Sequence, residues 1–138
     1  MRLTSNPKII YTALFVDDPA ELIKMFPPKH PKIFAHHSTN QFRPKDTGDL
    51  EIGKKSRIKI LGRASDEKGD VLLVENSKSE NKHPHITLSC TEGVSPVYSQ
   101  ELLERSAQNG TVEMFETPLY AAVTEGYYNS EGKNILAV

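Results

Sequence analysis

Apolar residues fall in short runs that are separated by turn-forming residues. The first run, residues 8–16, is rich in β-branched and aromatic side chains and ends at an Asp-Asp-Pro turn, as a buried strand does. Asp18 can cap a following helix with Pro19 at its first position, and apolar residues recur at helical spacing until a Pro-Pro pair at 27–28. Residues 8–26 are therefore predicted to form a strand and then a helix.

The middle of the chain shows the patterns of further strands. The run at 33–42 is predicted to form one strand, and the polar residues 43–51 that follow it predict a loop. Segments 56–61 and 71–74 flank the turn-forming residues 65–70, which is typical of a β-hairpin. Residues 76–82 form a polar linker that is too short to divide two domains.

The last third adds a strand, a helix and a strand pair. Residues 84–90 predict a strand, and a helix is expected from Pro96 or Tyr98 to Ala107, with Gly110 beyond its end. Segments 112–115 and 119–123 predict two closing strands. Pro118 between them permits only a bend or an edge position. This order predicts the α+β class, with two half-domains inside one domain that covers residues 1–138.

Composition and charge indicate the class of protein, the cellular compartment and the kind of RNA contact to expect. A chain of 138 residues with 25% charged and 37% hydrophobic residues has the balance of a single globular domain. One cysteine, no signal-peptide pattern and no apolar stretch near the roughly 20 residues of a membrane span favour a cytoplasmic protein. With a net charge of −1, the protein has no overall positive potential to attract a nucleic-acid backbone, so any RNA contact is expected to be local.

Two short elements carry the candidate chemistry. His37 is followed two residues later by Thr39, and His85 by Thr87. In an extended strand, residues two apart share a face, so each element presents one imidazole and one hydroxyl to the same side. If the two strands lie close together, these groups converge on a small tetrahedral group such as a phosphodiester.

Two histidines suit the opening of a 2′,3′-cyclic phosphate at an RNA end. A base must take a proton from the attacking water, and an acid must protonate the departing ribose oxygen on the opposite side of phosphorus. Imidazole titrates near neutral pH, and threonine hydroxyls can hydrogen-bond the non-bridging oxygens. This mechanism requires no metal and no cofactor.

The second element has the clearer strand pattern. Ile86 and Leu88 alternate with His85 and Thr87, so one face can pack against a core while the other faces a cleft. In the first element, by contrast, Ser38 and Asn40 stand at the alternating positions.

With these elements, the sequence resembles the two-histidine (2H) phosphoesterase superfamily, and within it the cyclic phosphodiesterase domain of fungal and plant tRNA ligases and related RNA-repair proteins. The likeness covers residues 10–103: a strand with Tyr11, a histidine element, the step Leu50-Glu51-Ile52-Gly53, and HPHITLS at 83–89. It implies a bilobal α+β fold with the histidines in a groove, a metal-independent hydrolase, and a 2′-phosphate product. By position, His37 and His85 would be the acid/base pair, and Thr39 and Thr87 would bind phosphate.

The first element departs from the family pattern, which usually has apolar residues where Ser38 and Asn40 stand. The strand there is expected to be an edge or irregular, and His36 with Ser38 is an alternative to His37 with Thr39. Two further residues are candidates for substrate contacts, Arg43 just after this element and Tyr120 in a late apolar segment.

Other interpretations stay open at this stage. Five histidines suggest a metal site, but no His-x₃-His on a helix and no cysteine pair accompanies them. The same site could act on a cyclic dinucleotide or another small cyclic nucleotide. A third interpretation is a non-catalytic module that binds RNA ends. A separate RNA ligase or kinase is a candidate partner, and no membrane partner is expected.

Overall fold

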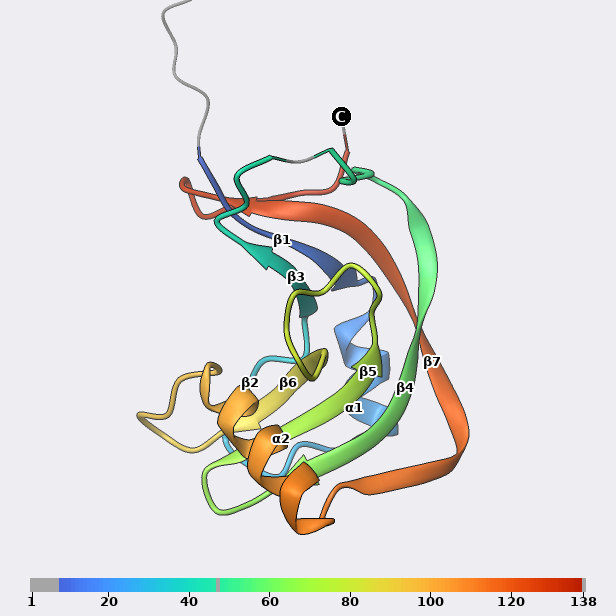
Figure 1. The fold of residues 1–138 in the computed structure, drawn as a ribbon, viewed down its shortest axis with the longest axis vertical. Coiled ribbons are helices and arrows are strands. Elements are labelled where there is room, and N and C mark those ends of the chain that lie inside the picture. The colour runs from blue at the N-terminus through green and yellow to red at the C-terminus, as the bar shows by residue number, and fades with distance from the viewer. Residues whose placement is uncertain (1–7, 47, 138) are drawn as a thin grey trace, which may run out of the picture.

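An antiparallel sheet carries the fold, and the computed structural model describes residues 8–46 and 48–137. The strands of this part run in the order β2-β6-β5-β4-β7-β1-β3, with β8 paired to β7, and all pairs are antiparallel (Figure 1). Their bounds, with the two helices, are β1 (Ile9–Val16), α1 (Pro19–Met25), β2 (Lys32–Ile33), β3 (His37–Phe42), β4 (Lys55–Ser65), β5 (Gly69–Glu75), β6 (His85–Cys90), α2 (Tyr98–Asn109), β7 (Glu113–Asn129) and β8 (Asn134–Ile135). The predicted α+β class is confirmed.

The two longest strands, β4 and β7, connect the two halves of the sheet. The first part of β7 pairs with β4, and its last part pairs with β1, which in turn carries β3. On the other side of β4 lie β5, β6 and β2. Figure 1 shows β1 and β3 in the upper half of the molecule and β5 and β6 in the lower half, joined by the long curved strands.

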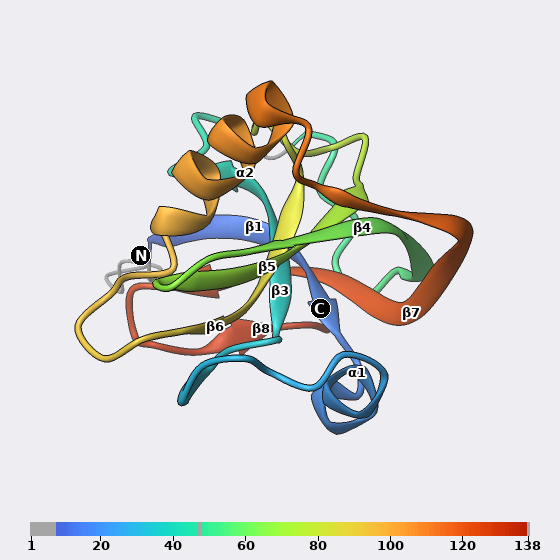
Figure 2. The ribbon, with the colours of Figure 1, turned by 90° about the horizontal axis from the view of Figure 1, so that it is seen from below.

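The two helices cover opposite faces of the lower half, as Figure 2 shows. On β5, Leu72 belongs to the main core cluster together with Leu22 of α1, whereas Val71 packs with Leu102 and Leu103 of α2. Alternation along the strand therefore sends neighbouring side chains to different helices. Burial of these faces on the sheet provides most of the stability of such short helices.

The helix ends follow the sequence signals. The Asp18 carboxylate accepts from the Glu21 N–H, and Pro19 opens α1, as predicted. At the other helix, Gly110 has a φ of 68° and ends α2 in the left-handed conformation. Of the helices in residues 8–46 and 48–137, neither is long and apolar enough to cross a membrane.

The run at 33–42 is not one strand, which corrects the prediction. It forms β2 and β3, which pair with β6 and β1 in different halves of the sheet. Ala35 between them has a φ of 58° and turns the chain. Residues 34–36, between β2 and β3, form a crossing segment. Its Phe34 and Ala35 N–H groups donate to Leu88 O and Thr87 O of β6, each at 2.8 Å. The segment therefore ties β6 to the start of β3.

The two closing strands predicted around Pro118 are one strand, β7, which is a second correction. Leu119 pairs with Ile60 and Met114 with Gly62, so residues 115–118 lie opposite Leu61 alone. A bulge of this kind leaves residues without ladder hydrogen bonds and bends the strand. Pro118, which has no N–H to donate, is accommodated there without ending the strand.

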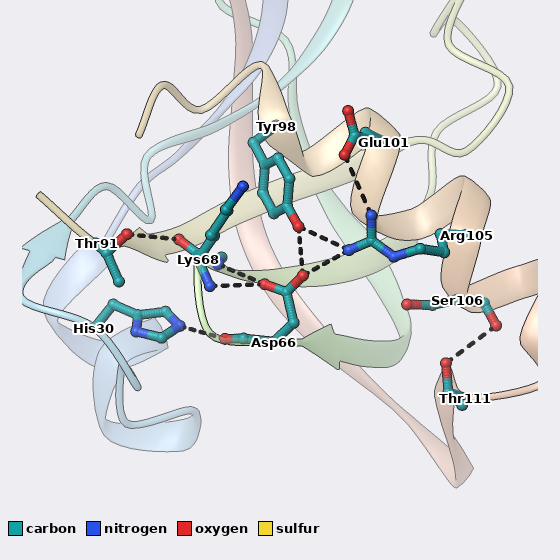
Figure 3. A network of polar contacts seen from close by, with 10 residues as sticks. His30, Asp66, Lys68, Thr91, Tyr98, Glu101, Arg105, Ser106 and Thr111 are labelled. Carbon is teal, nitrogen blue, oxygen red and sulfur yellow. Dashed lines mark hydrogen bonds and ion pairs between the residues drawn. The ribbon is translucent and has the colours of Figure 1, made fainter. Parts of the chain in front are cut away.

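A polar network fixes α2 against the β4–β5 turn (Figure 3). The Asp66 carboxylate accepts from the Tyr98 hydroxyl and, at 2.6 Å, from the Arg105 guanidinium, both on α2. The same carboxylate accepts from the N–H groups of Lys68 and Gly69 at 2.9 Å. Because Tyr98 is the first residue of α2, this network sets where the helix starts over the sheet.

Candidate active site

The two histidine elements meet at one cavity of about 600 Å³. His37 and Thr39 reach it from β3, and His85 and Thr87 reach it from β6, although these strands are not paired in the sheet. The crossing segment, the end of β3, segment 76–82 and the start of α2 supply the rest of the lining, which is Phe34, His36, Phe42, Glu80, Asn81, Pro96, Val97 and Gln100. The arrangement brings two imidazoles and two hydroxyls to a shared space.

The β6 half of the site is built on the core. Ile86 and Leu88 are both 0% exposed on one face of β6, while His85 and Thr87 point to the cavity on the other. His85 Nδ1 donates to the backbone oxygen of His83 at 2.8 Å, because a carbonyl oxygen can only accept. In the neutral ring the lone pair therefore lies on Nε2. The Thr87 and Ser99 hydroxyls share a hydrogen bond of 2.7 Å.

The β3 half is built on aromatic stacking. The His37 ring stacks on Tyr11 of β1 at a centroid distance of 4.7 Å and on His36 at 4.6 Å. Tyr11 stacks in turn on Tyr128 of β7 at 5.2 Å. His37 is also the cross-strand partner of Phe15. These rings limit the orientations that the His37 imidazole can take.

His36 and His37 differ in whether the hydroxyl two residues on faces the cavity. Ser38 is 0% exposed and its hydroxyl accepts from Asn76 on the side away from the cavity. His36 has a position on the cavity wall but no hydroxyl two residues on that faces the cavity. His37 and Thr39 therefore both line the cavity, whereas Ser38 does not. His36 Nδ1 lies 2.5 Å from His37 Nδ1 and is a neighbour that can share its proton.

Burial makes the cavity unfavourable for charged imidazoles. The pKa of His37 falls from 6.5 to about 3, mainly because the ring is buried and to a smaller extent because of positive charge on His36 and His85. Burial also lowers the pKa of His85, but the hydrogen bond to His83 O works in the opposite direction. A bound anion would relieve this penalty, because negative charge stabilises protonated imidazole.

Two predicted substrate contacts do not line this cavity. Arg43 is exposed and places its guanidinium 5.2 Å from the Phe42 ring. Tyr120, on β7, is 45% exposed, with the Arg57 guanidinium 5.0 Å from its ring. Sequence reasoning instead missed Phe42 and Val97, which line the cavity and are 55% and 71% exposed. Phe42 ends the first histidine element and Val97 stands between Pro96 and Tyr98, so neither has a local pattern that marks a cavity wall.

In the part of the chain that the structure describes, no group of three or more His, Cys, Asp or Glu residues is arranged to hold a metal ion.

No protein-family model matches the sequence, and no curated protein sequence matches it. Among solved structures, the fold is similar to the crystal structure of a fungal RNA kinase, with a TM-score of 0.60 and 16% sequence identity. The match covers 89% of this chain and 46% of that one, so this chain spans less than half of the length of the kinase. At this identity the likeness is one of fold.

Proposed function

We propose that the protein is a metal-independent phosphodiesterase of the two-histidine type, which hydrolyses the 2′,3′-cyclic phosphate at an RNA end to a 2′-phosphate. One observation carries the proposal: His37 with Thr39 and His85 with Thr87 line a single cavity although their strands are not paired. Paired imidazoles at a phosphate can supply both the base and the acid that the reaction needs.

The reaction can be written with the two rings alone. Water attacks phosphorus and gives a proton to one imidazole, while the bond from phosphorus to the 3′ oxygen breaks. The other imidazole, protonated at the start, gives its proton to that oxygen, so a 2′-phosphate and a 3′ hydroxyl leave the site. Exchange of one proton with solvent at each ring restores the starting state.

The surroundings of the rings favour His37 as the base and His85 as the acid. The hydrogen bond from Nδ1 to His83 O stabilises a protonated His85, and Nε2 then carries the proton to be given. The lowered pKa of His37, about 3, keeps its ring neutral near pH 7, as a base requires. It is a base at Nε2 in the tautomer whose Nδ1–H donates to His36 Nδ1.

The hydroxyls and the cavity size suit a nucleotide end. Thr39 and Thr87 line the cavity, and their hydroxyls can donate to the non-bridging oxygens, where charge builds in the transition state. A cavity of about 600 Å³ exceeds a phosphate group and leaves space for the ribose and base. The exposed ring of Phe42 at its edge offers a surface for base stacking, which is how proteins commonly hold unpaired RNA bases.

An RNA end is also consistent with the charge and with the fold comparison. A net charge of −1 does not favour binding along a nucleic-acid backbone, whereas recognition of one terminal nucleotide needs no such field. The structural neighbour is named as an RNA kinase, and this supports a substrate of the RNA-end class.

The test is turnover of a short RNA that ends in a 2′,3′-cyclic phosphate, in excess chelator, with the product identified by phosphorus NMR. We expect a 2′-phosphate from the wild-type protein, and its absence would contradict the proposal. Turnover of cyclic dinucleotides with none of the RNA would move the substrate to that class. RNA binding without product, retained in His37→Asn and His85→Asn, would instead identify a binding module.

A further inference from the structure

The inner face of β3, which points away from the cavity, is polar. The two residues that alternate with His37 and Thr39 are Ser38 and Asn40, which are 0% and 3% exposed. Buried polar side chains destabilise a fold unless they are hydrogen-bonded. Both are bonded to one residue, Asn76, which follows β5 and is 6% exposed.

Asn76 uses every polar atom of its side-chain amide. Its Nδ2 donates to Ser38 Oγ at 3.1 Å and to Asn40 Oδ1 at 2.8 Å. Its Oδ1 accepts from the backbone N–H of Lys78 at 3.2 Å. Because a backbone N–H can only donate, the Lys78 contact determines which end of the amide is oxygen, and Nδ2 must face β3.

The same residue is linked to the His85 strand through the chain. Leu73 of β5 is the cross-strand partner of His85, and the N–H of Val74 donates to Pro84 O at 3.0 Å. Asn76 follows directly after β5. It therefore joins β3 to the β5–β6 pair, although β3 and β6 stand far apart in the strand order.

Segment 76–82 continues this contact along the outer edge of β3, which is the last strand of the sheet order. The N–H of Glu80 donates to Asn40 O at 2.7 Å, and the Ser79 hydroxyl donates to Thr39 O at 2.8 Å. The Glu80 carboxylate accepts from the Phe42 N–H at 2.9 Å. These bonds occupy part of the edge that would otherwise be open and hold the backbone around Thr39.

We propose that Asn76 is a positioning residue that aligns β3 so that His37 and Thr39 face the same phosphate as His85. This inference rests on the proposed function of the cavity. Hydrogen bonds weaken steeply when their geometry is distorted, so the bonds from Asn76 favour one register and depth of β3. Catalytic rate is sensitive to such placement, since a shift of about 1 Å costs on the order of 10²-fold.

Asn76→Ala is the first test, because it removes both donors to β3. We expect kcat for the cyclic-phosphate RNA to fall by about 10- to 10²-fold with little change in KM, since the rate depends on the orientation of the reacting groups. A purely structural role would lower the amount of folded protein and leave kcat per folded molecule unchanged.

A triple variant separates stability from positioning. Ser38→Ala with Asn40→Leu and Asn76→Leu replaces the cluster by apolar groups, and such exchanges of all partners are often close to neutral for stability. We expect this variant to unfold near the wild-type denaturant concentration but to keep the low kcat of Asn76→Ala. If Asn76→Ala does not fold, the triple variant alone decides.

Asn129→Ala is the matched control. Asn129 is 4% exposed, and its Oδ1 accepts from the N–H groups of Glu131 and Lys133 in the turn between β7 and β8. The change removes the same side chain at similar burial without touching β3. We expect a loss of stability with kcat unchanged.

The second measurement needs no turnover. NMR titration of the His37 ring in the free protein reports its environment, because burial holds its pKa far below 6.5. We expect the His37 pKa to rise in Asn76→Ala and in the triple variant, and to stay as in wild type in Asn129→Ala. A wild type without turnover would contradict the proposed function, and the titration would still test the positioning.

Wild-type kcat together with an unchanged His37 titration, in Asn76→Ala or in the triple variant, would overturn the positioning role. A lowered kcat with a raised His37 pKa in both variants would uphold it.

Discussion

Strands β3 and β6 each present one imidazole and one threonine hydroxyl to the cavity, but they are supported in different ways. β6 rests on Ile86 and Leu88 in the main core, whereas β3 rests on Ser38 and Asn40, which are held by Asn76. Apolar packing suits a strand inside the sheet, because neighbouring strands already fix its register. β3 is an edge strand with one paired neighbour, and directional hydrogen bonds replace the missing strand. The same chemistry can therefore be positioned by different physical means in one molecule.

The largest expected difference between the strands is in stability. Ile86→Ala removes fully buried hydrocarbon and should lower the free energy of unfolding by about 2–5 kcal/mol. Ser38→Ala removes one hydrogen bond from a network that keeps its other members, and should cost about 0.5–1.5 kcal/mol. Urea unfolding of both variants measures the difference. Equal losses would contradict the division into apolar and polar support.

The two threonines should differ in stability but not in their part in catalysis. Thr39→Val and Thr87→Val each remove a hydroxyl near the phosphate, and each should lower kcat by about 10²-fold. Thr87→Val also leaves the buried Ser99 hydroxyl without its 2.7 Å partner, so it alone should also lower the unfolding midpoint. Steady-state kinetics and thermal unfolding test the pair, and a valine variant with wild-type kcat would exclude that threonine from the phosphate contact.

A smaller effect is expected from the stack on His37. Tyr11→Leu keeps an apolar side chain on β1 but removes the aromatic face that packs on the imidazole at 4.7 Å. Such pairs contribute about 0.5–1.5 kcal/mol beyond their buried area. We expect a loss of stability in this range and a broader or shifted His37 signal by NMR, with the His85 signal unchanged. A change confined to His85 would contradict the separate construction of the two halves.

A separate effect is expected in the pH dependence of folding. Burial lowers the pKa of His37 from 6.5 to about 3, so between these pH values the unfolded chain binds more protons than the folded one. Stability should therefore decline as the pH falls below about 6.5 and continue to decline toward about 3, with one group contributing at most about 1.4 kcal/mol per pH unit. His37→Asn should flatten the curve in this window. An equally steep curve in the variant would show that His37 is not the group responsible.

The contrast between the strands also explains what could be predicted from the sequence. The alternation of His85 and Thr87 with Ile86 and Leu88 indicated both the strand and its cavity face, because apolar burial is visible as a local pattern. The support of β3 depends on Asn76, which is distant in sequence, so its polar positions looked irregular. Hydrogen bonds between side chains that are distant in sequence produce no periodic pattern along the chain, so they cannot be recognised from the sequence alone.

Local turns and bulges were the other limit. Ala35 takes a positive φ without being glycine or asparagine, so its residue type did not signal the break between β2 and β3. Pro118 suggested a break in β7 that a bulge in fact accommodates. Arg43 and Tyr120 were chosen for residue type and sequence neighbourhood. Arg43 lies beyond the end of β3 with a φ of 47°, and Tyr120 is exposed on β7, so neither is on the cavity wall.

The central claim is that His37 and His85 act on one phosphorus, and the double variant His37→Asn/His85→Asn tests it most directly. Each single variant should lower turnover of the cyclic-phosphate RNA by about 10²- to 10⁴-fold. Groups that act as a unit are strongly non-additive, so the double variant should be no more than a few-fold slower than the slower single variant. Full turnover in either single variant, or losses that multiply in the double variant, would contradict the shared site.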